Sequence, residues 1–239
     1  MQDIQRQIIA LGGGGFSMEP DNSSLDLYVL NQSRSSHPAV CLLPTASGDA
    51  DSYIARFYSA FSRYNCHPSH LTFFQRTPDT RAHLMNQDVI YVSGGNTRSM
   101  LAVWREWGLP DLLKEAWQSG VILAGISAGA ICWFKQGLSD SVAGKLIVLD
   151  CLGFLEGSCT PHYDGEPERR PALHEFLKKQ EILPGYAIDN GVAIHFVGLD
   201  AKRAVSSRPH AKAYRVYKTN GFIEEESIVV EYIDEEKSR

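Results

Sequence analysis

The sequence predicts an α/β fold, with a mostly parallel sheet and antiparallel strands toward the C-terminus. Over the first two thirds of the chain, short and wholly apolar runs alternate with longer segments whose apolar residues recur at helical spacing. Apolar strands without polar alternation, each followed by a helix, indicate a parallel sheet covered on both faces. The 239 residues, 44% of them hydrophobic, suffice for one sizeable core.

The elements of this sheet follow one another along the chain. Helix-period segments separate the apolar runs, and Gly108 suits the C-terminal cap of the second of these helices. The expected strands are 7–11 (QIIAL), 39–44 (AVCLLP), 71–74 (LTFF), 88–95 (DVIYVSGG) and 121–125 (VILAG). The expected helices are 52–64 (SYIARFYSAFSRY), 97–108 (TRSMLAVWREWG) and 109–120 (LPDLLKEAWQSG).

The pattern changes after Phe134, where strands and turns dominate. One helix is expected at 169–180 (RRPALHEFLKKQ), and several of the strands are expected to pair antiparallel at one edge of the sheet. The expected strand regions are 144–155, 157–164, 185–197, 213–218 and 227–233. Since no repeat, linker or boundary interrupts the chain, a single domain over 1–239 is expected, with residues 234–239 as a solvated tail.

Composition and charge exclude several classes of partner. A net charge of −5 and a pI near 5.9 give no basic surface for nucleic acid, and no apolar run approaches the ~20 residues that span a bilayer. The apolar stretch near the N-terminus is too short for a signal peptide. Five irregularly spaced cysteines match neither a disulfide framework nor a zinc site. We expect a cytoplasmic protein without cofactor, metal, nucleic-acid partner or membrane partner, as a monomer or homodimer.

A candidate nucleophile, Ser127, lies in GISAG, where the apolar run 121–126 meets a helical segment. A sharp strand-to-helix corner needs small flanking residues and raises its hydroxyl at the carboxyl end of the sheet. The backbone N–H of Ala128 opens the following helix and favours negative charge beside the serine. Without that chemistry, the serine would simply cap the helix.

A serine nucleophile requires a base to accept its proton. Among eight histidines, His162 in CTPHYDG is the best candidate, because Pro161 restricts the approach and a loop follows. His195 lies within an expected strand, at an alternating position, which favours a hydrogen-bonded structural role. The other histidines lie in a helix or in polar and turn contexts that indicate surface positions.

The third residue, which would orient the imidazole, is expected in AIDNGVAI. Asp189 and Asn190 are both candidates there, although Asp-Asn-Gly is also an ordinary turn sequence. Asp140 in LSDSV is a rival.

Two glycine-rich loops are candidates for binding a ligand through the backbone. LGGGGFS lacks the third glycine of a dinucleotide fingerprint and the Lys-Ser/Thr of a P-loop, so it is either a loop whose backbone approaches a ligand or a tight turn. SGGNT offers the N–H of Gly94 or Gly95 as a second donor to an oxyanion. Cys132, within the helix after the corner, is expected to be a buried thiol and not a nucleophile.

Together and in this order, LGGGGFSM, SGGNT, GISAGA and PHYD resemble the peptidase E family of aspartyl dipeptidases and cyanophycinases. The resemblance covers nearly the whole chain and implies a fold similar to class I glutamine amidotransferases, a flavodoxin-like layered sheet. It also implies that Ser127 is the nucleophile of a serine peptidase and His162 its base. The family's third member is usually a glutamate, and a gap-free match places Asn190 there, beside Asp189. Either residue can complete the triad, or the site has lost activity or serves another purpose.

Peptidases of this kind cleave very short peptides with an N-terminal aspartate, which sets the expected substrate. Asp164 and Glu166 are candidates for binding its free amine, and Arg169 and Arg170 for binding a carboxylate. These four residues can equally form a solvated charge cluster. The alternatives to a dipeptidase are an amidase or esterase for non-peptide substrates and a small-molecule binding protein with weak or no catalysis.

Overall fold

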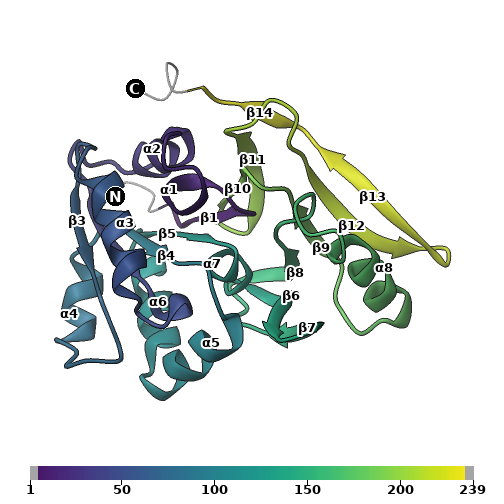
Figure 1. Cartoon of the computed structure of the whole chain (residues 1–239), viewed down its shortest axis with the longest axis horizontal. Coiled ribbons are helices and arrows are strands. Elements are labelled where there is room, and N and C mark those ends of the chain that lie inside the picture. The colour runs from purple at the N-terminus through teal and green to yellow at the C-terminus, as the bar shows by residue number, and fades with distance from the viewer. Residues whose placement is uncertain (1–4, 235–239) are drawn as a thin grey trace.

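A computed structural model describes residues 5–234, and among these residues two sheets lie side by side (Figure 1). The first sheet has eight strands in the order β14-β11-β10-β1-β5-β4-β2-β3. Strands β1, β5, β4, β2 and β3 pair parallel, and β10 pairs antiparallel with both β1 and β11. The strands are β1 (Gln7–Leu11), β2 (Ala39–Leu43), β3 (His67–His70), β4 (Val89–Val92), β5 (Ile122–Ile126), β10 (Val192–Val197), β11 (Asp200–Ser206) and β14 (Val230–Tyr232).

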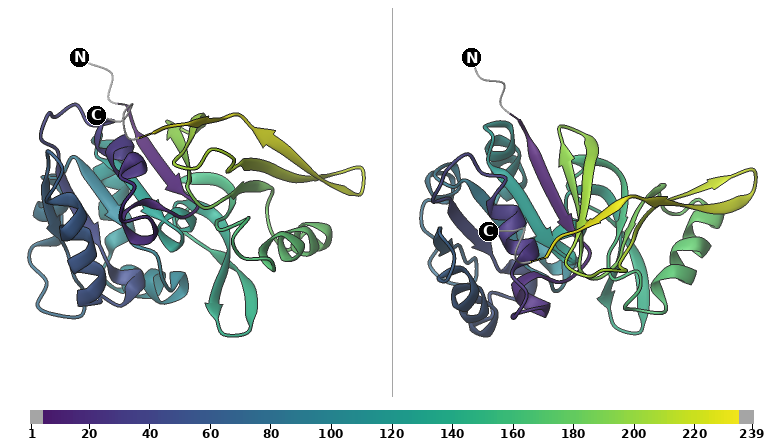
Figure 2. Two further views of the ribbon diagram at one scale, coloured as in Figure 1. Left: turned by 45° about the horizontal axis from the view of Figure 1, so that its top comes forward. Right: turned by 90° about the horizontal axis from the view of Figure 1, so that it is seen from above.

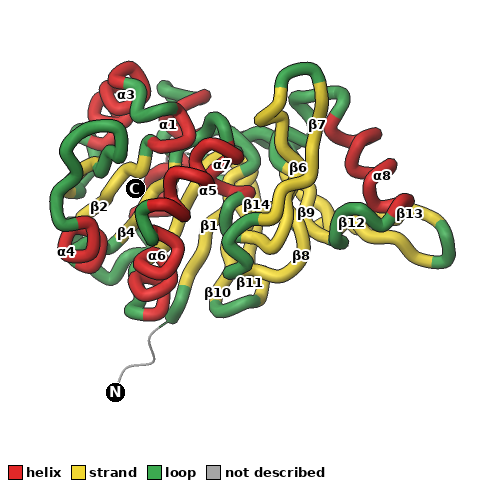
Figure 3. The backbone as a smooth tube through the Cα atoms, turned by 90° about the horizontal axis from the view of Figure 1, so that it is seen from below, coloured by secondary structure: helices red, strands yellow, loops and turns green. Residues whose placement is uncertain are grey.

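Helices cover both faces of this sheet, so its strands are apolar on both sides. In β1, Ile9 and Leu11 pack with one group of helices, whereas Ile8 and Ala10 pack with the other. Figure 3 shows α5, α6 and α7 over the strands on one side. The first group is α1 (Gly15–Met18), α2 (Ser24–Leu30) and α3 (Asp51–Phe61); the second is α4 (Thr80–Met85), α5 (Thr97–Glu106), α6 (Leu109–Gln118) and α7 (Ala128–Ile131).

The second sheet has six strands in the order β13-β12-β9-β8-β6-β7. The helix α8 (Arg169–Lys179) packs on it through Leu173 and Leu177, and the β12–β13 hairpin projects from the body of the molecule (Figure 2). The strands are β6 (Phe134–Val142), β7 (Lys145–Asp150), β8 (Leu155–Thr160), β9 (Gly185–Ile188), β12 (Ala213–Thr219) and β13 (Phe222–Ile228).

The carboxyl ends of the parallel strands in the two sheets meet. In the loop after β1, the Gly12 carbonyl accepts a hydrogen bond of 3.0 Å from the backbone N–H of His162, which follows β8. In the same loop, the Gly13 carbonyl accepts a hydrogen bond of 3.0 Å from the N–H of Gly191, which follows β9. This junction therefore brings segments distant in sequence to one edge, where open α/β sheets place their ligands.

Three local expectations differ from the structure. The edge strand β3 is His67–His70 and not 71–74; because it pairs only with β2, it tolerates polar residues and a proline. The helix after Ser127 is a single turn, and β6 begins directly afterwards at Phe134. Of the C-terminal strands, β10 and β11 pair antiparallel at one edge of the first sheet as expected, whereas the others, apart from β14, build a second sheet that was not expected.

The helices expected at 52–64, 97–108, 109–120 and 169–180 are all present, with small differences at their ends. Within residues 5–234, no helix combines the length and the apolar character needed to cross a bilayer. Residues 235–239 of the expected tail lie outside the described residues.

Candidate active site

Ser127 occupies the corner between β5 and α7 in a strained backbone conformation. Its φ of 55° and ψ of −110° lie where residues with a Cβ are rarely found. The corner is held by a hydrogen bond from the Ser127 N–H to the Leu11 carbonyl at 3.0 Å, and its own carbonyl accepts the N–H groups of Ala130 and Ile131. The side chain is half-buried, so the hydroxyl is raised at the sheet edge and not lost in the core.

The glycines around this corner are required by close packing. A Cβ on Gly125 would overlap the carbonyl of Gly129, and a Cβ on Gly129 would overlap the carbonyl of Val92 in β4. The one-turn helix therefore lies directly on two strands. Only glycine at both positions allows the sharp turn that carries Ser127.

His162 lies just beyond β8, also with a positive φ, of 54°. Its Nδ1 is 2.7 Å from Oδ1 of Asn190, which is 8% exposed. Because an amide oxygen only accepts hydrogen bonds, this contact requires the proton on Nδ1 of the neutral imidazole. The lone pair is then on Nε2, the tautomer that a general base for a serine requires.

The LGGGG loop lies against this pair. A Cβ on Gly13 would overlap Oδ1 of Asn190 and would lie 3.0 Å from Nδ1 of His162. The backbone of the loop therefore packs closely against the His162–Asn190 pair. Its expected approach to a ligand stays a prediction.

Asp189 points elsewhere. Its Oδ2 accepts the backbone N–H of Lys212 at 2.8 Å, and burial raises the pKa of this carboxyl. The residue that supports Asn190 is Asp164, whose Oδ1 accepts the Asn190 N–H at 2.7 Å. Of the two neighbouring candidates for the third position, the structure brings Asn190 to His162.

The backbone donors expected for an oxyanion lie around Ser127. Ala128 is the first residue of α7, so its N–H has no acceptor within the helix. A Cβ on Gly94 would lie 3.5 Å from the Cβ of Ser127, which places the SGGNT turn beside the serine. The N–H of Gly94 itself donates to the hydroxyl of Tyr53 at 3.1 Å.

All four charged residues considered for substrate binding have partners within the protein: Asp164 bonds to the Asn190 N–H, and the other three form ion pairs. Arg169 is 1% exposed; its Nε donates to Glu166 at 2.6 Å and its Nη1 to the Leu138 carbonyl at 2.9 Å. Arg170 forms a two-pronged ion pair with Glu225. The bond to Leu138 attaches α8 to β6, and the pair with Glu225 attaches it to β13.

The cluster around Glu225 was not expected from the sequence. Tyr163 and His174 also contact this carboxylate, at 2.5 and 2.7 Å, and Arg170 lies over the Tyr163 ring at 4.9 Å. Hydrogen bonds with Arg170, Tyr163 and His174 outweigh burial and lower the pKa of Glu225 to about 2. Glu225 thus joins the β12–β13 hairpin to the helix that follows His162.

The rival residues lie apart from the Ser127 corner or are buried. Asp140 is 61% exposed at the end of β6 and faces Arg169 at 3.4 Å. Cys132 is fully buried, and burial raises its pKa well above the usual range. His195 contacts Tyr28 and Gln7, and burial lowers its pKa to about 4, so it stays neutral in a structural role.

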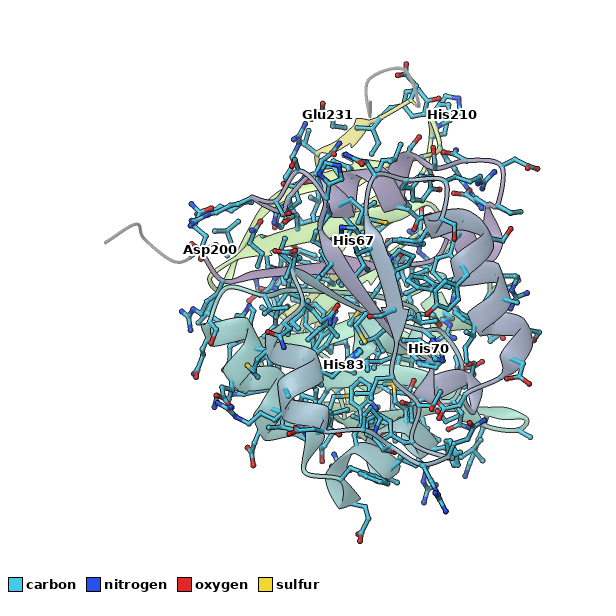
Figure 4. The ribbon with its side chains drawn as sticks, turned by 90° about the vertical axis from the view of Figure 1, so that its left-hand side faces the viewer. His67, His70, His83, Asp200, His210 and Glu231 are labelled. Atoms are coloured by element: carbon cyan, nitrogen blue, oxygen red, sulfur yellow. The ribbon has the colours of Figure 1, made fainter. Side chains whose placement is uncertain are left out.

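Three of the remaining histidines lie together, and a fourth lies apart from them. Figure 4 shows His67, His70 and His83 near β3 and α4, with His210 apart from them. Within residues 5–234, no three His, Cys, Asp or Glu side chains are grouped to hold a metal ion.

Two participants were missed in the sequence: Asp164 as the support of Asn190, and Tyr53 as the partner of Gly94. The only available signal for Asp164 was its place two residues after His162. For Tyr53 there was no signal, because an aromatic residue on an amphipathic helix normally packs in the core.

Comparison with known proteins gives a consistent assignment. The profile of peptidase family S51 matches residues 8–204. Uncharacterized peptidase YgaJ of Bacillus subtilis is 55% identical over 229 residues, covering 95% of this chain and 99% of that protein. Peptidase E of Pasteurella multocida is 31% identical over 134 residues, covering 48% of this chain and 53% of that protein.

Solved structures confirm the predicted fold class. A crystal structure of a peptidase from an acI-B1 actinobacterium superposes with a TM-score of 0.71 at 18% identity, covering 96% of each chain. A putative peptidase E from Listeria monocytogenes superposes with a TM-score of 0.61 at 20% identity, covering 85% of this chain and 98% of the other.

Proposed function

This chain belongs to peptidase family S51 and is a serine-type peptidase, and from that premise we propose that it hydrolyses short peptides through an acyl-enzyme on Ser127. The observation that carries the proposal is the 2.7 Å contact between His162 Nδ1 and Asn190 Oδ1, together with the strained corner at Ser127. The two N–H groups of Ser127 and His162 bond to consecutive carbonyls, those of Leu11 and Gly12, which supports a shared site.

In the proposed reaction, Oγ of Ser127 attacks the peptide carbonyl while Nε2 of His162 accepts its proton. The N–H groups of Ala128 and Gly95 stabilise the oxyanion. The imidazolium then protonates the leaving amine as the C–N bond breaks. Water, deprotonated by the same histidine, attacks the ester and releases the acid and Ser127. Asn190 orients the imidazole as an uncharged partner, a role that asparagine also fills in papain-like enzymes.

For the substrate we propose dipeptides with an N-terminal aspartate. Asp164 is exposed and lies two residues after His162, so it remains our candidate for binding the free amine. Glu166, Arg169 and Arg170 have partners on the protein, and we assign them to the attachment of α8. The carboxylate of the substrate is then bound by other groups.

The test is a panel of dipeptides with the purified protein. We expect release of aspartate from Asp-Leu, slower hydrolysis of Ala-Leu, and no hydrolysis of N-acetyl-Asp-Leu, whose amine is blocked. Ser127→Ala should be inactive, whereas Ser119→Ala, at the exposed end of α6, should retain wild-type rates. Hydrolysis of p-nitrophenyl acetate without hydrolysis of any dipeptide would instead indicate an esterase, and full turnover by Ser127→Ala would refute the nucleophile.

A further inference from the structure

Tyr53, from α3, lies beside the SGGNT turn although nothing in the sequence connected it with catalysis. Its hydroxyl accepts the N–H of Gly94 at 3.1 Å, and the side chain is 8% exposed. A Cβ on Gly94 would lie 3.9 Å from that hydroxyl and 3.5 Å from the Cβ of Ser127. One glycine thus separates the tyrosine hydroxyl from the candidate nucleophile.

The backbone donors of the turn can be followed one by one. The N–H of Ser93 donates to the Leu43 carbonyl at 3.1 Å, and that of Asn96 donates to the Ala46 carbonyl at 2.7 Å. The N–H of Gly94 is taken by Tyr53. Among the described residues, the N–H of Gly95 donates to no acceptor, so it is the donor left for an oxyanion.

The position of Gly95 is fixed on its other side as well. Its φ is 136°, and a Cβ there would overlap the carbonyl of Ala46. The Gly94–Gly95 peptide unit therefore lies between two held units, because the Ser93–Gly94 unit bonds to Tyr53 and the Gly95–Asn96 unit bonds to Ala46. Removing the tyrosine hydroxyl would release the first of these units, so that the Gly94–Gly95 peptide could rotate from that side.

Packing fixes the ring of Tyr53, and burial keeps its hydroxyl neutral. Its ring packs edge-on against Phe16 with centroids 5.5 Å apart. Burial raises the pKa of Tyr53, while hydrogen bonds with Gly94 and Ser17 offset part of that rise. The hydroxyl therefore stays protonated while it accepts the Gly94 N–H.

We propose that Tyr53 is a positioning residue for the oxyanion site: by holding the Gly94 N–H, it aims the Gly95 N–H at the carbonyl oxygen attacked by Ser127. This inference rests on the proposed function. It assigns the second oxyanion donor to Gly95, and it gives Gly94 the separate task of anchoring the turn. A donor aimed in advance is most valuable in the transition state, where the oxygen becomes charged.

The test compares Tyr53→Phe with Tyr58→Phe. Both changes remove one hydroxyl from α3, but that of Tyr58 contacts His70 at 2.8 Å, on the β3 side. Loss of a whole oxyanion donor costs about 10²–10³ in kcat, so a donor that remains but is misaimed should cost about 10- to 100-fold. We expect this loss in kcat for Asp-Leu and in the rate of labelling by a fluorophosphonate, with KM and the pH profile unchanged.

Phe fills nearly the same space as Tyr, and circular dichroism with thermal melting checks that the fold is retained. Incorporating 3-fluorotyrosine at position 53 provides a second variant that weakens the acceptor and keeps the ring, and it should give a smaller loss in kcat. A kcat for Tyr53→Phe within twofold of the wild type would overturn the assignment, as would a loss carried by KM or accompanied by a shifted pH profile.

The outcomes also separate the two proposals. If the wild type and Tyr58→Phe are labelled on Ser127 at the same rate as Tyr53→Phe, only the role of Tyr53 is refuted. If the wild type is neither labelled on Ser127 nor able to hydrolyse Asp-Leu, the proposed function itself fails, and the role of Tyr53 fails with it.

Discussion

Replacing Asn190 by aspartate tests the uncharged third residue directly. The substitution keeps the shape of the side chain and places a negative charge where Oδ1 now lies, 2.7 Å from Nδ1 of His162. An imidazolium beside a carboxylate is stabilised relative to the neutral imidazole that acts as base. The Asn190→Asp variant should therefore need a higher pH to reach full activity.

The size of the shift follows from the geometry. Unit charges about 4 Å apart attract by about 4 kcal/mol at an effective dielectric constant of 20, equivalent to about 3 pH units. Two effects oppose this attraction: burial of the new carboxylate at an 8% exposed site, and repulsion by Asp164, which bonds to the same residue. A net upward shift of about 1–2 pH units is expected.

The assay is kcat/KM for Asp-Leu between pH 5 and 10, with Asp189→Asn as the matched control. Because the Asp189 carboxylate accepts from the Lys212 N–H, its neutralisation should leave the acidic limb of the profile in place. If Asp189→Asn moves the limb and Asn190→Asp does not, the partner of the imidazole has been assigned to the wrong residue. If neither variant moves it, His162 is not the base.

Three further outcomes are expected. Burial raises the pKa of Asp26 to about 7, against 3.8 for the free side chain. The free energy of unfolding should therefore decrease by up to about 4 kcal/mol as the pH rises from about 4 to 7, because the folded state then loses its preference for the proton. Asp26→Asn should lack that fall in urea titrations at pH 5 and 8. Gly125→Ala, overlapping the Gly129 carbonyl, should lower the free energy of unfolding by about 1–3 kcal/mol and abolish Asp-Leu hydrolysis; an active, equally stable variant would contradict the packing argument. Arg170→Lys should weaken the pair with Glu225, cost about 0.5–1 kcal/mol in urea unfolding and leave KM within twofold; a tenfold higher KM would make Arg170 a substrate anchor.

The sequence predicted the parts of the fold where burial alone decides the structure. The apolar runs of β1, β2, β4 and β5 are buried on both faces, so composition was sufficient to find them. Composition did not identify the edge strand β3, which contains two histidines and a proline because only one side of it is paired. Strands β7, β8, β9 and β12 fall in expected strand regions, but their assembly into a second sheet was not predicted, because partly exposed strands of mixed composition do not indicate which strands they pair with.

The candidate site was predictable where small residues mark a backbone constraint. Gly125 and Gly129 identify the Ser127 corner because nothing larger fits there. Side-chain direction was not predictable: Asp189 and Asn190 are adjacent, and only the end of β9 determines which of them faces His162. For the same reason, a buried Arg169 and a catalytic arginine look alike in sequence.

If Ser127 is an activated nucleophile, a reagent that labels serine nucleophiles should form its covalent adduct there. The wild-type protein is treated with a fluorophosphonate, digested and analysed by mass spectrometry. We expect one adduct, on the peptide that contains Ser127, and a labelling rate that decreases at low pH as a single group becomes protonated. An adduct on any other residue, or dipeptide hydrolysis that continues in a protein that takes up no label, would contradict it.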